Sequence, residues 1–440
     1  MNPPSSRNAL YYLIELIPYF CFYLFLLASL LLTSLSHSTH REKMSCTEPT
    51  LNTPLLSSFP NKTDYSNQDP EPLTKPKTRH QSNNILISIP HSPNSQTPYK
   101  CLATIAGNAG PISSLTLCGE FLFSASSTKD ITVWQHPDLR QFAKFGHGEG
   151  SVKALVAMGN RVFSAHQDGK VRVWKVSSRS ENAFRLVASL PTTRDYLGRC
   201  LKQSNYVQTR RNHRRLWIEH GDSISCLAVH GDLVYSGSWD KTLKVWQMSN
   251  LKCLESIRAH DDAINALTVY DGILYTASAD GKIKAWGKRN VMKNSHCLLN
   301  TLVAQNNMSW NAVATCLNTG IVYAAGSDGH VAAWQCELEK EKKVWTLVCD
   351  VKAHDMAVLS LCVVSDLVFS GSGDKSIGVW KREMGGGLGK LGLLRGHEGP
   401  VRCLQASWYR AGRGYVVYSG GLDRSLRVWW VPQEDILGDK

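Results

Sequence analysis

The sequence predicts an all-β fold, a seven-bladed β-propeller preceded by a disordered leader. A short phrase that ends in tryptophan recurs seven times in the chain. Most repeats have the length of a four-stranded propeller blade. Runs of β-branched and aromatic residues, which are typical of strands, precede each phrase. With 43% apolar and 19% charged residues the chain can build a packed core, which excludes disorder throughout its length.

Each repeat carries polar residues at a fixed spacing. An aspartate stands six residues before the tryptophan in six repeats, and a serine or threonine stands four residues before that position in six repeats. A histidine lies about twenty residues before the aspartate in five of them. An aspartate in a tight turn needs hydrogen-bond donors, and a histidine, a hydroxyl and an indole can form a buried chain with it. The seven phrases end at Trp134, Trp174, Trp246, Trp286, Trp334, Trp380 and Trp429.

This spacing resembles that of the WD40-repeat family, and the resemblance covers all seven repeats. It implies that the four residues form one structural hydrogen-bond network inside a blade. The first repeat departs from the pattern at Asn108 and Thr128, and the fifth departs at Met308 and Ala324, so we expect these two blades to be locally weaker. The five implied structural tetrads are His147, Ser164, Asp168 and Trp174; His220, Ser236, Asp240 and Trp246; His260, Thr276, Asp280 and Trp286; His354, Ser370, Asp374 and Trp380; and His397, Ser419, Asp423 and Trp429.

A propeller must also join its two chain ends. Only eleven residues follow Trp429, too few for a turn and another good strand. The apolar segment Tyr99–Ile105 precedes the first inner strand, and we predict that it supplies the outer strand of the last blade. Such a clasp would remove the exposed edges of that sheet.

The first 98 residues differ from the propeller, which we assign to residues 99–440. Residues 16–35 form a run of 20 residues without a charge, about the length that crosses a bilayer. Residues 1–43 are therefore a membrane anchor, a signal peptide, or an extension that the working protein does not use because translation starts at Met44. Residues 44–98 are rich in Ser, Thr, Asn and Pro. We predict that they are a disordered leader, because they cannot bury enough apolar area to offset the entropy of ordering.

The sequence contains no pattern that indicates an enzyme. Ser, His and Asp recur together, but a catalytic triad occurs once and needs an exposed nucleophile beside an oxyanion hole. Phosphate-loop and nucleophile-elbow motifs are missing, and so are Cys-x-x-Cys pairs and other metal-ligand spacings. We therefore predict no catalytic residues, no cofactor, no metal and no small-molecule substrate. The cysteines of the first inner strands are predicted to be buried free thiols, which favours a reducing compartment; they are Cys226, Cys316, Cys362 and Cys403.

The repeat is interrupted between the second and third blades. The interval from Trp174 to Trp246 is 72 residues, whereas the other intervals are 40 to 49 residues. The additional residues lie at about 192–215 and are strongly basic. Two interpretations are open. The segment is a solvated face or a nuclear import signal, or it is a docking arm for an acidic protein surface or for phosphates. Interleaved aromatic residues could stack on a base or pack on a partner; they are Tyr196, Tyr206 and Trp217. The seven cations are Arg194, Arg199, Lys202 and the candidate partner-binding residues Arg210, Arg211, Arg214 and Arg215.

The resemblance places the histidine-bearing loops on one rim of the propeller, the usual protein-docking face of the family. Trp239 precedes Asp240 in a turn on the same rim, and an exposed indole there is a candidate partner-binding hot spot. Alternatively, Trp239 packs over a neighbouring loop. The rim loops also carry carboxylates at Glu149, Asp222, Asp261, Asp262, Asp355 and Glu398.

Further motifs narrow the resemblance. Cys101-Leu-Ala-Thr-Ile105, Asn205-Tyr-Val207 with a nearby Arg-Arg pair, and Leu216-Trp-Ile-Glu-His220 are similar to the plant JINGUBANG-like group of WD40 proteins. The resemblance implies a non-enzymatic scaffold and regulator in plant growth or pollen signalling, with residence in the nucleus and cytoplasm. Its partners would be other proteins, for example a transcription regulator, and charge alone would give only non-specific nucleic-acid affinity.

Two other functions stay open. One is a substrate receptor of a cullin-type ubiquitin ligase, which would bind a ligase adaptor. Trp286-Gly-Lys-Arg289 approaches the Trp-Asp-x-Arg element of such receptors, with Gly287 in place of the acidic residue. The other is a membrane-tethered trafficking propeller, which depends on residues 16–35 spanning a membrane.

Overall fold

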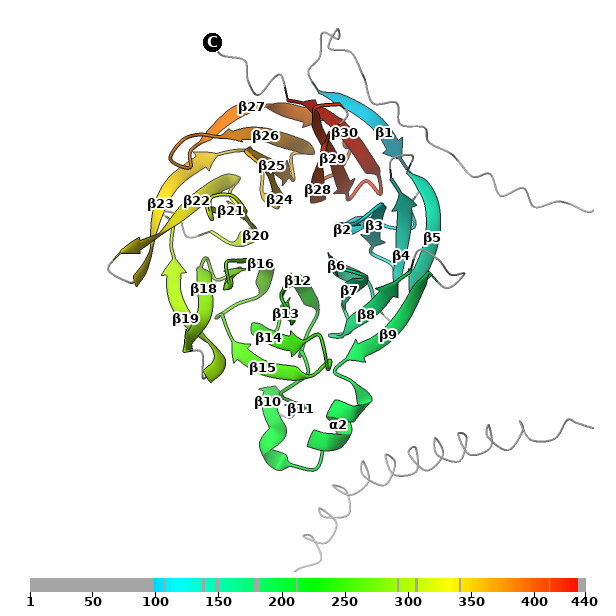
Figure 1. Ribbon diagram of the computed structural model, residues 1–440, viewed down its shortest axis with the longest axis vertical. Coiled ribbons are helices and arrows are strands. Elements are labelled where there is room, and N and C mark those ends of the chain that lie inside the picture. Colours follow the sequence, from blue (N-terminus) through cyan, green and yellow to red (C-terminus); the bar gives the residue numbers. More distant parts are fainter. Residues whose placement is uncertain are drawn as a thin grey trace, which may run out of the picture. The chain divides into compact units, whose positions relative to one another are not determined.

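The computed structural model describes residues 99–433 apart from short gaps, and the predicted segments 1–43 and 44–98 lie outside the described residues. Within the described part, seven four-stranded antiparallel sheets are arranged in a ring (Figure 1), which confirms the predicted seven-bladed propeller. None of the helices described here is long and apolar enough to cross a membrane. The gaps are residues 107, 137–138, 147–149, 178–182, 211–212, 291–292, 305–307, 340–341 and 411.

The first four blades follow the chain from the inner to the outer strand. Blade one contains β2 (Ile112–Cys118), β3 (Phe121–Ser126), β4 (Asp130–Gln135) and β5 (Arg140–Gly146). Blade two contains β6 (Val152–Met158), β7 (Arg161–His166), β8 (Val171–Val176) and β9 (Phe184–Leu190). Blade three contains β12 (Ile224–His230), β13 (Leu233–Ser238), β14 (Thr242–Gln247) and β15 (Cys253–Arg258). Blade four contains β16 (Ile264–Tyr270), β17 (Ile273–Ser278), β18 (Ile283–Asn290) and β19 (Lys293–Leu302).

The last three blades complete the ring. Blade five contains β20 (Trp310–Thr315), β21 (Val322–Gly326), β22 (His330–Glu339) and β23 (Lys342–Lys352). Blade six contains β24 (Val358–Val364), β25 (Leu367–Ser372), β26 (Ser376–Arg382) and β27 (Leu388–Arg395). Blade seven contains β28 (Val401–Tyr409), β29 (Gly414–Gly421), β30 (Leu426–Pro432) and β1 (Lys100–Ile105).

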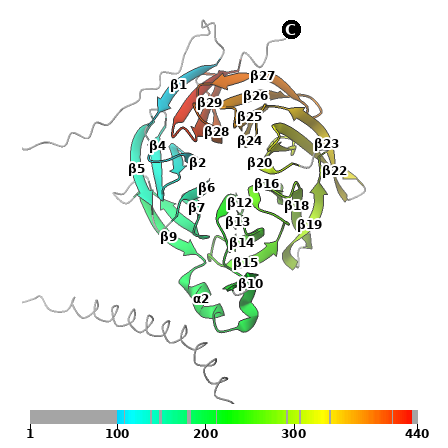
Figure 2. The ribbon, with the colours of Figure 1, turned by 180° about the vertical axis from the view of Figure 1, so that it is seen from behind.

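Blade seven takes its outer strand from the beginning of the described chain. Strand β1 pairs antiparallel with β30, with Ile105 opposite Leu426. Figure 2 shows β1 at the outer edge of the ring, in the blade that also contains β28 and β29. Ala103 and Ile105 are buried in the core cluster that joins blades seven and one. The predicted clasp is therefore confirmed, and it closes the ring without a covalent link.

The apolar core lies between neighbouring blades. Each of the seven buried clusters combines side chains of two adjacent blades. In blade three, Tyr235 and Val245 face blade four, whereas Val234 and Trp246 face blade two. Because alternate residues of a strand point to opposite faces, an apolar run such as Leu-Val-Tyr at the start of β13 serves both interfaces. No blade can bury both faces without its neighbours, which is why the repeats close into a ring.

A bulge recurs in the inner strand of every blade. In β2, Ile112 pairs with Ser126 and Ser114 pairs with Ala125, so the intervening Ser113 is left out of the ladder. The same register shift follows the first residue of each of the other six inner strands. A bulge re-aims the side chain of the extra residue. The seven bulge residues are Ser113, Lys153, Ser225, Asn265, Asn311, Leu359 and Arg402.

The basic insertion between blades two and three folds as a small module. It contains α2 (Thr193–Arg199), a short 3-10 helix at Gln203–Asn205, and a hairpin of β10 (Tyr206–Arg210) and β11 (His213–Leu216). Thr192 caps α2 and forms a capping box with Asp195. Figure 1 shows the module projecting outward from the ring beyond β9 and β15.

Candidate interaction sites

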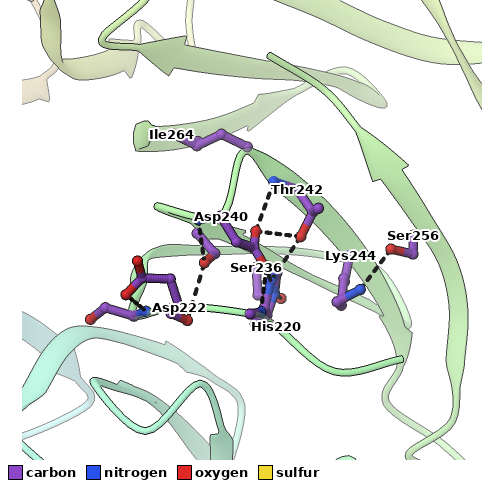
Figure 3. A network of polar contacts seen from close by, with 12 residues as sticks. His220, Asp222, Ser236, Asp240, Thr242, Lys244, Ser256 and Ile264 are labelled. Atoms are coloured by element: carbon purple, nitrogen blue, oxygen red, sulfur yellow. Dashed lines mark hydrogen bonds and ion pairs between the residues drawn. The ribbon is translucent and has the colours of Figure 1, made fainter. Parts of the chain in front are cut away.

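The recurring polar residues meet inside the blades. In blade three, His220 contacts Ser236 Oγ through Nε2 at 2.8 Å and Asp240 Oδ2 through Nδ1 at 3.3 Å. The Trp246 indole donates to Ser236 Oγ at 2.9 Å. Figure 3 shows His220, Ser236 and Asp240 gathered together in this blade. The same contacts, at 2.7 to 3.0 Å, join His260, Thr276, Asp280 and Trp286 in blade four; His354, Ser370, Asp374 and Trp380 in blade six; and His397, Ser419, Asp423 and Trp429 in blade seven.

A neutral imidazole suits the donors and acceptors of the network in blade three. An indole N–H can only donate, and an ionised carboxylate can only accept. Ser236 therefore accepts from Trp246 and donates its own hydrogen to Nε2 of His220, whose Nδ1–H donates to Asp240. A neutral imidazole satisfies every group in this chain. The network thus stabilises buried polar side chains without a formal positive charge.

The pKa directions agree with this assignment. Burial lowers the pKa of His220, His260 and His397, and the nearby aspartates oppose that shift only in part. Burial alone would raise the pKa of Asp423, but hydrogen bonds from His397 and Ser425 bring it down to about 2. At neutral pH each of these blades holds a neutral histidine against an ionised aspartate.

Blade two satisfies its serine differently. Ser164 Oγ accepts from the Trp174 indole at 2.8 Å, and its imidazole partner is Nε2 of His166, also at 2.8 Å. His147, which the repeat spacing assigns to this set, lies outside the described residues. The spacing missed His166 because the corresponding position in blade three is a serine, Ser238, which bonds to its own turn instead.

Asp168 of blade two also has a different partner. It forms an ion pair with Arg172 at 2.5 Å, and the arginine side chain is almost completely buried. In blade three the corresponding residue is Lys244, whose ammonium donates to Ser256 (Figure 3). The same ammonium also donates to the carbonyl of Trp217. A cation at this position of the third strand therefore does not by itself predict an ion pair with the turn aspartate.

Blade one replaces the aspartate with a hydroxyl. Thr128 Oγ1 lies 2.7 Å from Ser126 Oγ and accepts a hydrogen bond from the backbone amide of Asp130 at 3.3 Å. Asn108, near the position of the histidine, donates instead to the carbonyl of Arg424 in blade seven at 2.9 Å. Asn108 therefore links two blades rather than stabilising one.

Blade five replaces the network with apolar contacts. Met308 and Ala324 are buried at the positions of the histidine and the serine. Trp310 packs edge-on against Trp334, with ring centroids 5.6 Å apart. Asp328 still lies in the turn that carries the aspartate in the other blades, and its carboxylate accepts a hydrogen bond from the backbone amide of His330 at 3.0 Å.

The tetrads have the geometry of structural elements. The hydroxyls belong to fully buried residues, with Ser164, Ser236, Ser370 and Ser419 at 0% exposure. A nucleophile must reach its substrate, so these serines cannot act in that role in the folded blade. Among the described residues, no group of three or more His, Cys, Asp or Glu side chains could hold a metal ion.

The four cysteines predicted in inner strands are free thiols; three of them lie in those strands, and Cys316 follows the end of β20 directly. Cys226, Cys316 and Cys403 are buried, and Cys362 is half-buried. Burial raises the pKa of Cys226 and Cys403 to about 12. Since the thiolate is the reactive form, these residues serve as small apolar side chains in the folded propeller.

Trp239 lies on the rim and is accessible. Its side chain is 42% exposed, and its backbone amide donates to the carbonyl of Ser223 at 3.1 Å. The ammonium of Lys153 lies 5.8 Å from the ring centroid. Asp222, Asp261, Asp262, Asp355 and Glu398 are exposed on the rim loops, and Glu149 lies outside the described residues.

Aromatic residues attach the insertion to the propeller. Tyr196 OH donates to Glu219 Oε1 at 2.8 Å, and the guanidinium of Arg199 lies 4.9 Å from the centroid of the Trp217 ring. Tyr196, Tyr206 and Trp217 also pack against the core between blades two and three. These contacts hold the module in place, and the stacking of the rings on a base or their packing on a partner stays a prediction.

The cations of the insertion divide into two groups. Arg199 is partly buried and pairs with Asp195 at 3.2 Å. Arg211 and the side chain of Arg210 lie outside the described residues. The exposed cations are Arg194, Lys202, Arg214 and Arg215.

Apolar side chains of the insertion are exposed among these cations. Leu197 on α2 is 57% exposed, and Leu201, four residues further along, is 88% exposed. Val207 on the hairpin is 51% exposed. The charge of this segment is evident from the sequence, but the exposure of the leucines is not, because only the folded module shows that they do not enter the core.

Comparison with known proteins gives four matches to the family model "WD domain, G-beta repeat", at residues 139–175, 212–247, 251–287 and 389–429. Zinc finger CCCH domain-containing protein 59 of Arabidopsis thaliana is 28% identical over 109 residues, which are 25% of this chain and 18% of that protein. WD repeat-containing protein pop2 of Schizosaccharomyces pombe is 28% identical over 97 residues, 22% of this chain and 12% of that protein.

F-box/WD-40 repeat-containing protein At5g21040 of Arabidopsis thaliana is 22% identical over 144 residues, 33% of this chain and 23% of that protein. The chain thus spans less than a quarter of the length of these curated relatives. Among solved structures, the WD40 beta propeller domain of Doa1 has a TM-score of 0.57 and 16% identity over 77% of this chain and 99% of that chain. This likeness shows the fold alone.

Proposed function

We propose that this chain, whose place among the WD40-repeat proteins is supported by the family model and the WD-repeat relatives, is a non-enzymatic protein-interaction scaffold. The WD40 propeller is typically such a scaffold. The observation that carries the proposal for this chain is the folded basic insertion, which exposes Leu197 and Leu201 among cations.

The chemistry of the insertion indicates the kind of partner. Exposed leucines favour an apolar surface, because burying each of them stabilises a complex by about 1.5–3 kcal/mol. Arg194 and Arg214 add attraction for carboxylates and speed the encounter. The insertion therefore fits an acidic protein segment that carries apolar side chains.

Crosslinking in cells tests this proposal. The photoreactive residue p-benzoylphenylalanine replaces Leu201, and as a matched control it replaces Leu338, which is 70% exposed on β22 of blade five. We expect discrete protein adducts from position 201 and none from position 338. Arg194→Glu with Arg214→Glu should abolish the adduct without changing the melting temperature, since both side chains are exposed. Equal crosslinking at the two positions, or adducts that survive the charge reversal, would count against the proposal.

The finer assignment comes from the sequence motifs. Their similarity to the JINGUBANG-like group supports a regulator of plant growth or pollen signalling that resides in the nucleus and cytoplasm and holds a transcription regulator. Cell fractionation with sequencing of the mature N-terminus tests the location. A start at Met44 and recovery in nuclear and cytosolic fractions is the expected result. Carbonate-resistant membrane association with residues 16–35 retained would instead support the membrane-tethered propeller.

A second candidate function is a substrate receptor of a cullin-type ubiquitin ligase. The similarity to a protein named for an F-box and WD-40 repeats favours it. Arg289 would contact the adaptor, although its side chain lies outside the described residues. Co-purification of an adaptor subunit that is lost in Arg289→Ala would support this function, and its absence under proteasome inhibition would exclude it.

A further inference from the structure

The first two strands of blade seven are longer than those of the other blades. Strand β28 has nine residues and β29 has eight, whereas the corresponding strands elsewhere have five to seven. The network histidine and aspartate are accordingly 26 positions apart in blade seven and 20 positions apart in blades three, four and six. The additional positions lie in the hairpin of β28 and β29, which we call the blade-seven hairpin.

The blade-seven hairpin extends at the face of the propeller opposite the histidine loops. His397 precedes β28, so this strand runs away from the histidine loops and turns into β29 at the opposite face. The ladder of β28 and β29 has eight residue pairs, whereas the ladder of β12 and β13 in blade three has six. The end of the blade-seven hairpin is therefore an addition to the repeat that the packing of the blade does not require.

An indole is exposed near the end of this hairpin. The side chain of Trp408 is 41% exposed, and its ring packs edge-on against Tyr415 of the opposite strand, with centroids 4.9 Å apart. Tyr415 is buried in the core between blades six and seven. Tyr409 packs edge-on against Trp430 in the core between blades seven and one. Because both faces of the hairpin are anchored, little conformational freedom of the indole remains to be lost when a partner binds.

Two cations follow the indole. Arg410 and Arg413 are both exposed, and within the described residues the side chain of neither has an ion-pair or hydrogen-bond partner. No aspartate or glutamate occurs in residues 399–422. The backbone of Arg413 has a φ of 50°, in the left-handed region that favours glycine. A guanidinium thus stands where the turn by itself favours a residue without a side chain, and no described carboxylate pairs with it.

We propose that Trp408, Arg410 and Arg413 form a second docking surface, which binds a short acidic segment of a partner protein. Carboxylates of the segment pair with the two guanidinium groups, which match carboxylate geometry by donating two parallel hydrogen bonds. A bulky apolar side chain of the same segment packs on the indole. Tryptophan and arginine are the side chains that most often contribute a large share of the binding energy at protein interfaces.

A short segment fits this surface better than an extended phosphate surface does. Glu120 of blade one and Glu383 of blade six are exposed, and both lie in turns at the same face as the end of the blade-seven hairpin. A bilayer or a nucleic-acid backbone that spans neighbouring blades would meet these carboxylates as well as the arginines. A short peptide contacts the hairpin alone and avoids that repulsion.

The inference rests on the proposed scaffold function and adds a second binding surface to it. The basic insertion lies between blades two and three, whereas the hairpin belongs to blade seven. A segment bound at one surface therefore leaves the other accessible. The propeller can hold two acidic segments at once, from two partners or from one long partner.

Peptide binding to the purified full chain tests the inference. The protein carries Arg194→Glu and Arg214→Glu, which remove the attraction of the insertion for carboxylates, so the result is independent of the crosslinking test at Leu201. The probes are three fluorescein-labelled pools of nine-residue peptides, with aspartate-leucine-aspartate, asparagine-leucine-asparagine or aspartate-serine-aspartate at the centre. Fluorescence anisotropy should show at least tenfold tighter binding of the first pool than of the second, and at least fivefold tighter binding than of the third.

Substitutions in the hairpin separate the two contributions. Trp408→Ala should weaken binding of the aspartate-leucine-aspartate pool at least fivefold and remove the preference for leucine over serine. Arg410→Gln with Arg413→Gln should remove the preference for aspartate over asparagine. The melting temperature of the arginine variant should stay unchanged, because neither side chain has a described partner to lose. Loss of binding in that variant therefore does not reflect loss of the fold.

Matched controls come from other parts of the ring. Trp239→Ala removes an indole that is 42% exposed on the rim of the histidine loops. Arg258→Gln with Arg395→Gln removes two exposed arginines of the outer strands β15 and β27. Both control variants should bind the aspartate-leucine-aspartate pool as the parent protein does.

Four outcomes would overturn the inference. The first two are equal binding of the aspartate and asparagine pools, and a loss of binding in Trp239→Ala that Trp408→Ala does not reproduce. The third is sedimentation with phosphatidylserine vesicles that requires Arg410 and Arg413, which would assign the surface to a lipid headgroup. In the fourth, Glu434→Gln with Asp435→Asn tightens peptide binding at least tenfold, which would show that the acidic residues after Gln433 are the occupant.

Discussion

Blades seven and five reach the same four-stranded sheet by different means. Blade seven has a complete polar network, in which Asp423 accepts hydrogen bonds from His397, Ser425 and the amide of Glu398, but it takes its outer strand from the far end of the chain. Blade five is continuous in sequence, and its outer strands β22 and β23 are longer than those of most blades. It has a methionine and an alanine where blade seven has the histidine and the serine.

The difference shows that the network is one of two ways to stabilise a blade. In blade seven, polar groups hold the rim turn by hydrogen bonds that must all be satisfied. In blade five, Trp310 and Trp334 stabilise the same region by packing. The stability of the polar network in blade seven depends on the protonation of a histidine, whereas the stability of the apolar packing in blade five does not.

Removing the clasp should have the largest effect. Deleting residues 99–106 removes the buried side chains Ala103 and Ile105 and the ladder of β1 with β30. We expect the free energy of unfolding to fall by about 3–5 kcal/mol, from lost apolar burial and lost hydrogen bonds. Urea unfolding measures the change. As a control on the same strand, Ile105→Ala should cost much more than Thr104→Ala, whose side chain is exposed. An unchanged unfolding midpoint after the deletion would show that the clasp does not stabilise the ring.

Removing the turn aspartate should distinguish the two blades. Asp423 has a side chain that is 8% exposed, and Asp423→Ala leaves the imidazole, two amides and a hydroxyl without their acceptor. We expect a loss of about 2–4 kcal/mol. Asp328→Ala in blade five removes the acceptor of one amide, that of His330, and should cost less than about 1 kcal/mol. Thermal unfolding of both variants measures the difference, and equal losses would contradict the contrast.

Stability should fall as the pH is lowered below about 6.5. The pKa values of His220, His260 and His397 are lowered in the folded protein. The unfolded chain therefore binds protons that the folded chain does not, and each histidine reduces stability by up to about 1.4 kcal/mol per pH unit below its ordinary pKa. The loss continues until the pH reaches the lowered pKa values of the folded state. Melting temperatures between pH 7.5 and 5.5 measure this effect. His397→Gln should reduce the slope by one histidine's share, whereas a flat profile in the wild type would exclude the neutral-histidine network.

The smallest effect is expected from rebuilding the network in blade five. Met308→His alone should lower stability by about 1–3 kcal/mol, because it buries an imidazole beside Ala324, which has no hydroxyl to offer. Adding Ala324→Ser supplies the missing link between Trp334 and the new histidine. The pair should then be less destabilising than the sum of the single changes, with a coupling of about 1 kcal/mol in a double-mutant cycle. Additive effects of the two substitutions would show that blade five cannot form the polar hydrogen-bond network.

The fold could be read from the sequence to a large extent. The seven phrases and their spacing predict seven four-stranded sheets, and the apolar Tyr99–Ile105 predicts the clasp, because each is a local pattern repeated at a fixed interval. The candidate sites were less predictable. Ser164 pairs with His166, which a spacing of twenty residues does not indicate. The aromatic residues of the insertion, which the sequence offered as a contact surface, pack inward while Leu197 and Leu201 stay outside.

By itself, the sequence determined the number of blades, the network residues of blades three, four, six and seven, and the position of a basic insertion. These features depend on periodicity and composition, which can be recognised directly in the amino-acid sequence. The tertiary structure decided which side chains meet across blades. Lys153 and Arg402 lie 249 positions apart in the numbering, and ring closure and a recurring bulge bring both to one cavity. Such proximity follows from the closed geometry of the ring, because no local pattern encodes the distance between two strands on opposite ends of the chain.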